Sequence, residues 1–110
     1  MGKTIIEKIL ASHSGKEQLS PGDIVDVSID ARVARDFGGA NVVKHMKDNQ
    51  LSLHDPTSTF FTFDCNPTGS DQKYATNQHI CRQYAREQGI KVYDIDKGIG
   101  THVLLSLIHI

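Results

Sequence analysis

The fold is decided by residues 59–95, TFFTFDCNPTGSDQKYATNQHICRQYAREQGIKVYDI. The apolar, aromatic start of this stretch predicts a strand over 59–64. A long helix is predicted to begin at Ser70, its N-cap, and to end at Gly89, because one face carries apolar residues (Tyr74, Cys81, Tyr84 and Ala85). A third strand is predicted over 90–95, which completes a βαβ unit. The sequence therefore predicts the α/β class, with helices layered on a mixed, partly parallel sheet.

Further elements are predicted on both sides of this unit. Thr4 and Glu7 form a capping box, which predicts a helix that ends near Ser14–Gly15. Residues 24–30, IVDVSID, alternate apolar and polar side chains, as a half-buried strand does. A short helix is predicted through Val42, Val43 and Met46, and residues 96–105 turn into a possible fourth strand.

The composition limits the class of protein. The chain has 110 residues, enough for one domain with a modest core, and 38% of them are hydrophobic. Its net charge is −1 with the signs interspersed, so no electrostatic footprint for nucleic acid or anionic lipid is expected. The longest apolar run is too short to span a bilayer. Two cysteines do not form a disulfide scaffold, which favours a reduced, cytoplasmic setting.

Three polar clusters follow the predicted strands. They are Arg35–Asp36, Asp64–Cys65–Asn66, and the glycine-spaced loop that carries His102. Ligands of α/β folds bind beyond the carboxyl ends of parallel strands, so these clusters are candidates for one site. Two plainer readings stay open: Asp64 could cap a turn, and His102, next to an apolar run, could be a satisfied core histidine.

The two thiols differ in their predicted environment. Cys81 lies on the inner face of the predicted long helix and is expected in the core. Cys65 follows a strand end, which could expose it. The adjacent carboxylate of Asp64 disfavours a thiolate, so a nucleophilic role for Cys65 is not expected.

Four stretches in fixed order carry a family resemblance: KTIIEKILASHSG, PGDIVDVSIDARVARDFGG, TFFTFDCNPTGSDQ and YAREQGIKVYDIDKGIGTHVLL. Together they resemble the start of the aconitase family, and most of all its branch of 3-isopropylmalate dehydratase large subunits and homoaconitase-like proteins. The resemblance covers roughly residues 3–105. It implies that residues 1–110 are an N-terminal fragment of an aconitase-like domain, with a tail at 106–110 that fits nothing in the family.

The resemblance implies an isomerising hydro-lyase, which removes water from a hydroxy di- or tricarboxylate and returns it at the neighbouring carbon. Such enzymes hold a [4Fe-4S] cluster in the full-length protein, pair with a small subunit and, in the 3-isopropylmalate branch, serve leucine biosynthesis. The fragment alone is expected to be inactive and to hold no cluster or other metal. The implied catalytic residues are Asp36, Asp64 and His102.

Two positions depart from the family pattern. Cys65 stands where the family usually has histidine, and Arg35 stands where it commonly has histidine or glutamine. An arginine can clamp a substrate carboxylate. The expected substrate-binding residues are Arg35, Cys65 and Asn66, and the departures at Arg35 and Cys65 are expected to alter specificity. The alternative is a small ligand-binding or interaction domain that keeps the fold without catalysis. A downstream D-S-H segment and a C…C-x-x-C pattern would decide for the enzyme.

Overall fold

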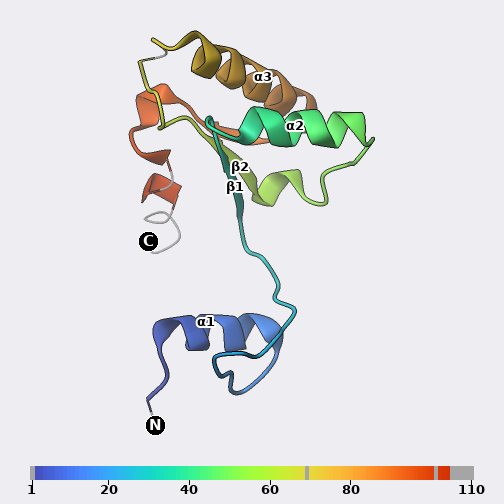
Figure 1. The fold of residues 1–110 in the computed structure, drawn as a ribbon, viewed down its shortest axis with the longest axis vertical. Helices are drawn as coiled ribbons and strands as arrows, with labels where there is room; N and C mark the ends of the chain where they lie inside the picture. Colours follow the sequence, from blue (N-terminus) through green and yellow to red (C-terminus); the bar gives the residue numbers. More distant parts are fainter. Residues whose placement is uncertain (1, 69, 101, 105–110) are drawn as a thin grey trace. The chain divides into compact units, whose positions relative to one another are not determined.

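The computed structural model describes residues 2–68, 70–100 and 102–104. The chain divides into two compact units, residues 1–30 and 31–110, and each is described by itself (Figure 1). Gly69, Thr101 (which directly precedes His102), and the tail at 106–110 lie outside the described residues.

The first unit is built on helix α1, Ile5–Ser14. The predicted capping box is confirmed: the Glu7 amide donates to Thr4 Oγ1, and the Thr4 amide donates to the Glu7 carboxylate. Gly15 ends the helix at a φ of 70°, a left-handed conformation that glycine adopts without strain.

The strand predicted at 24–30 is wrong. This segment has no strand conformation, and Ile24 and Ile29 expose 95% and 57% of their surface. Instead the chain follows α1: the Ser28 amide donates to the His13 carbonyl at 2.9 Å, and His13 Nε2 lies 2.7 Å from Asp30 Oδ2. Alternation alone does not form a strand, because a strand also needs a neighbouring strand to bond.

The second unit contains a sheet of three parallel strands, β1 Arg32–Arg35, β2 Thr59–Thr62 and β3 Lys91–Tyr93, in the order β1-β2-β3. Helix α2, Gly39–Asp48, connects β1 to the short 3-10 helix η1, Pro56–Ser58, before β2. Helix α3, Gln72–Gln88, connects β2 to β3, and a second 3-10 helix, η2, Ile95–Lys97, follows. The predicted α/β class is confirmed, and both described pairings are parallel.

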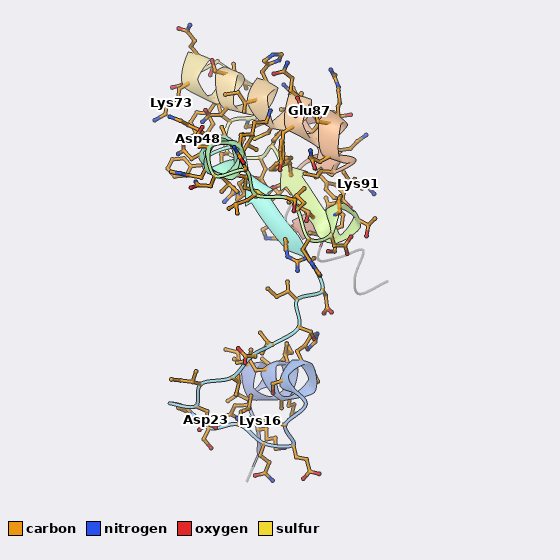
Figure 2. The ribbon with its side chains drawn as sticks, turned by 90° about the vertical axis from the view of Figure 1, so that its right-hand side faces the viewer. Lys16, Asp23, Asp48, Lys73, Glu87 and Lys91 are labelled. Atoms are coloured by element: carbon orange, nitrogen blue, oxygen red, sulfur yellow. The ribbon has the colours of Figure 1, made fainter. Side chains whose placement is uncertain are left out.

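The core lies between the sheet and the two helices, which run side by side (Figure 1). Phe61 on β2 pairs in register with Ala34 and Val92, and all three face this core. The remaining core members come from both helices and the strand ends (Ala40, Val43, Phe63, Cys81, Tyr84, Ala85 and Ile90). Cys81 is fully buried, as predicted. The helices also carry exposed charges, among them Lys73 and Glu87 on α3 (Figure 2).

Gly39 lies where α2 packs closely on the sheet and on α3. A Cβ at Gly39 would lie 3.0 Å from Cys81 Sγ and 3.5 Å from the Phe61 ring. The second glycine of the sequence RDFGG therefore lets the start of α2 approach both the sheet and α3.

Two predictions next to β2 and β3 are corrected. Asp71, not Ser70, caps α3: its carboxylate accepts the amides of Lys73 and Tyr74, because an acidic side chain also favours the positive helix start. The possible fourth strand is wrong, since Gly100 and residues 102–104 are helical. Within the described residues, no helix is long and apolar enough to cross a membrane.

Candidate functional site

The first strand end places a carboxylate inside the protein. Asp36 directly follows β1, and its amide continues the sheet pattern by donating to the Thr62 carbonyl at 3.1 Å. Its side chain is fully buried. Oδ1 accepts the Cys65 amide at 3.1 Å, and Oδ2 accepts the Asn66 amide at 3.3 Å. Asp36 therefore holds the backbone of the turn that follows β2.

Gln78 on α3 completes the surroundings of this carboxylate. Its Nε2 donates to Asp36 Oδ2 at 3.0 Å and to the Asn66 carbonyl at 3.1 Å. Burial raises the pKa of Asp36, but the hydrogen bonds from Gln78 and from Cys65 outweigh it and lower the pKa below its usual value. Asp36 is therefore an ionised, buried carboxylate near neutral pH.

The second strand end carries an ion pair. Asp64 Oδ1 accepts from Arg35 Nη2 at 2.7 Å and from Nε at 2.8 Å. The Asp64 side chain is 2% exposed, whereas the Arg35 side chain is 52% exposed. The hydrogen bond to Asp64 raises the pKa of Arg35. The pair therefore buries its anion and presents part of its cation to solvent.

Cys65 is half-buried in the same turn. Burial first, and then Asp36, raises the pKa of its thiol, while Arg35 acts in the opposite direction. The thiol is therefore protonated near neutral pH. Asn66 uses its side-chain oxygen within the turn, where it accepts from Thr68 Oγ1 at 2.9 Å.

The site residues do not fit a metal cluster. Ligand atoms of Asp36, Asp64 and Cys65 lie within 4.8 Å of one another. Yet the oxygens of Asp36 already accept N–H donors, and the Arg35 guanidinium lies against Asp64, where it would repel a cation. A [4Fe-4S] cluster needs three or four thiolates. The chain has two cysteines, and burial raises the pKa of Cys81 to about 11.

The third cluster reaches the same sheet edge by close packing. Gly100 lies against Thr62 and Tyr93, the last residues of β2 and β3, and a Cβ there would be 2.8 Å from Thr62 Cβ. Two residues later, His102 is exposed in this chain. Among the described residues, His102 is not part of the contacts that join Asp36 to the turn at Cys65 and Asn66.

The structure thus brings five of the six predicted site residues together, namely Arg35, Asp36, Asp64, Cys65 and Asn66. The sequence did not indicate Gln78, although it is a polar residue on the otherwise apolar face of α3, three positions before Cys81. Arg82, which pairs with Asp94 after β3, was also missed.

Comparison with known proteins finds relatives of this sequence. The chain is 33% identical over 107 residues to the 3-isopropylmalate dehydratase large subunit of Sulfurihydrogenibium sp.. It is 34% identical over 112 residues to the large subunit 1 of Methanopyrus kandleri and 35% identical over 106 residues to that of Pyrococcus furiosus. These matches cover 96%, 100% and 94% of this chain. No protein-family model matches it.

The matches cover only part of each relative. This chain spans about a quarter of their lengths, 25%, 27% and 25% in the same order. The resemblance to 3-isopropylmalate dehydratase large subunits is confirmed, and the chain is a homologue of part of them.

Proposed function

We propose that this chain is the N-terminal segment of the large subunit of a cytoplasmic hydro-lyase of the 3-isopropylmalate dehydratase or aconitase type. In this role the ends of β1, β2 and β3 form one wall of a site for a hydroxy di- or tricarboxylate. The proposal rests on the match along nearly the whole chain to large subunits with that name.

One structural observation supports placing the substrate site at the carboxyl-terminal edge of the sheet. Arg35 is held by the buried Asp64 but leaves about half of its side chain exposed at the carboxyl end of the parallel strands. A guanidinium forms paired hydrogen bonds with a carboxylate, and here its orientation is fixed before a ligand arrives. Arg35 would therefore bind a substrate carboxylate.

The other residues would act around that anchor. Asp64 would orient the group that transfers the proton, and His102 would hold or move the proton at an imidazole nitrogen. Asp36, buried and fully bonded, would position Cys65 and Asn66 through their amides. Cys65 would contact substrate as a neutral thiol, and Asn66 would complete this wall of the site.

Further groups would complete the enzyme. The homologous large subunits imply a partner small subunit and, for this family, a [4Fe-4S] cluster. The cysteines of this chain do not fit such a cluster, so its thiolates would belong to other parts of the protein. The isolated chain is therefore expected to be inactive.

A non-catalytic binding domain is the competing function. A domain that only binds hydroxy acids would need Arg35 and the Asp64 that holds it, but it would turn over no hydroxy acid. Turnover by the intact protein therefore separates the two functions, and Asp64→Asn tests the part of Asp64 in it. In the intact enzyme it should preserve the fold and lower turnover about 100-fold or more, the scale of a lost acid–base group.

The measurement pairs melting temperature with turnover on one preparation. Asp96→Asn is the matched control, because Asp96 is an exposed carboxylate after β3 that forms an ion pair with the exposed Lys97. Near-normal turnover in the Asp64→Asn protein would end the catalytic proposal. A lower melting temperature with normal turnover would make Asp64 a turn cap.

A further inference from the structure

Arg82 on α3 contacts the segments that follow two different strands. Its guanidinium forms two hydrogen bonds with Asp94, from Nε to Oδ2 at 2.8 Å and from Nη2 to Oδ1 at 2.7 Å. Both side chains are about one-third exposed. A two-bond pair of this kind fixes direction as well as distance, so Arg82 sets where the chain leaves β3.

The same guanidinium lies over a residue at the end of β2. Arg82 Cζ is 5.0 Å from the centre of the Phe63 ring, a cation–π distance. Phe63 is fully buried, its amide donates to the Tyr93 carbonyl at 3.0 Å, and it directly precedes Asp64. The Arg82 side chain therefore contacts both the residue before Asp64 and the first residue of the loop that follows β3.

Asp94 in turn fixes the conformation of the residues that follow it. Its carboxylate accepts the Ile95 amide at 2.7 Å, and its carbonyl accepts the Lys97 amide at 3.0 Å, which together begin η2. The chain then turns at Gly98, with a φ of 75°, and Gly100 packs on Thr62. The fit at Gly100 leaves no room for a Cβ, so a small shift of η2 would separate the loop from β2.

We propose that Arg82 is a positioning residue that seats the loop 94–100 against the end of β2. Its effect is to present Asp64 and His102 at one edge of the sheet. The catalytic meaning of this arrangement rests on the proposed function, whereas the seating of the loop does not. The competing explanation is that Arg82 only stabilises α3 and the core.

The first test is made on the 110-residue chain by NMR. Arg82→Lys keeps the charge but loses the two-bond geometry. We expect the amides of Ile95 and Lys97 to exchange with solvent at least about 10-fold faster, and the contact between Gly100 Hα and the Thr62 methyl to weaken. Amides of the β1–β2 pairing should keep their protection.

Two variants make this test specific. Arg86→Lys is the matched control, since Arg86 is an exposed arginine one turn later on α3, and it should change neither measurement. Asp94→Asn keeps an acceptor for the Ile95 amide and should reproduce the effect of Arg82→Lys, with little added in the double variant. Uniformly faster exchange along the chain, or an unchanged loop, would overturn the proposal.

The second test uses turnover of the intact enzyme. Arg82→Lys should lower kcat about 10-fold or more with little change in KM, because a misplaced proton-transfer group slows the chemical step more than binding. If the loop moves but kcat does not, the catalytic part of the inference is refuted. If the unmodified enzyme turns over no hydroxy acid, the proposed function fails, and the NMR test still decides the seating.

Discussion

The ends of β1 and β2 place the same residue type in opposite situations. Asp36, after β1, is completely buried and directs its oxygens to two backbone amides and one side-chain amide. Asp64, after β2, is equally hidden but faces a guanidinium that reaches solvent. Asp36 thus fixes the turn, and Asp64 holds a cation whose side chain is half exposed to solvent. An aspartate at a strand end is therefore not by itself a catalytic signal.

The largest effect is expected from Asp36→Asn. The amide group cannot accept from Cys65, Asn66 and Gln78 together, because one of its two ends is a donor. We expect the free energy of unfolding to fall by about 2–4 kcal/mol, as for a lost buried charge with several donors. Urea unfolding of the two chains measures it. A loss below about 0.5 kcal/mol would mean that Asp36 does not build the turn.

The pH dependence sharpens this prediction. The pKa of Asp36 is lowered in the folded chain, so its contribution to stability is present above the unfolded pKa, about 3.9, and is lost as pH falls through the folded value. The stability gap between the native chain and Asp36→Asn should therefore narrow below about pH 4. A stability difference that stays constant down to low pH would contradict an ionised Asp36.

A smaller effect is expected at the other strand end. Arg35→Gln removes the counter-charge of the buried Asp64 and should cost about 1 kcal/mol, since water screens the exposed half of the pair. The matched control is Arg32→Gln on the same strand, because Arg32 donates to the neutral Ser58 Oγ, and among the described residues it forms no ion pair. Added salt should shrink the Arg35 effect but not the Arg32 effect. Equal losses of stability in the Arg35→Gln and Arg32→Gln variants would mean that the ion pair with Asp64 makes no special contribution.

The smallest effect is expected at Cys65, between the two carboxylates. Its pKa is raised by burial and by Asp36, so its alkylation by iodoacetamide should begin at higher pH than in the urea-unfolded chain. Arg35→Gln should raise that midpoint further, because Arg35 lowers the pKa. Cys81, fully buried, should stay unmodified while the chain is folded. Fast alkylation of Cys65 near pH 7 would contradict a protonated thiol.

The sequence predicted the helices of this chain better than its first strand. Capping at Thr4 and the apolar stripe of α3 are local patterns, and both are confirmed. The strand β1 has the sequence RVAR, and its two arginines make it unlike a typical strand sequence. The segment 24–30 alternates as a strand does but is not one. What makes β1 a strand is its pairing with β2, and a single sequence does not display its partners.

The candidate site was predictable in place but not in detail. The polar residues after each strand could be found because parallel strands end at the same edge. The burial of Asp36 could not, since it depends on Gln78, which lies on a helix far along the chain. The role of Arg82 could not be predicted for the same reason, because its partners Phe63 and Asp94 follow different strands.

The parallel pairings also have a kinetic consequence. Each joins two strands separated by a whole helix, so neither can form before a long loop has closed, and parallel sheets fold slowly for this reason. Asp36 can accept the amides of Cys65 and Asn66 only after β1 has paired with β2. Arg82 can bond to Asp94 only after α3 has packed next to β3. These polar contacts are expected to form after the folding barrier has been crossed, so their loss would hasten unfolding more than it would slow folding. The lifetime of the folded chain would then depend on the same contacts that shape its polar edge.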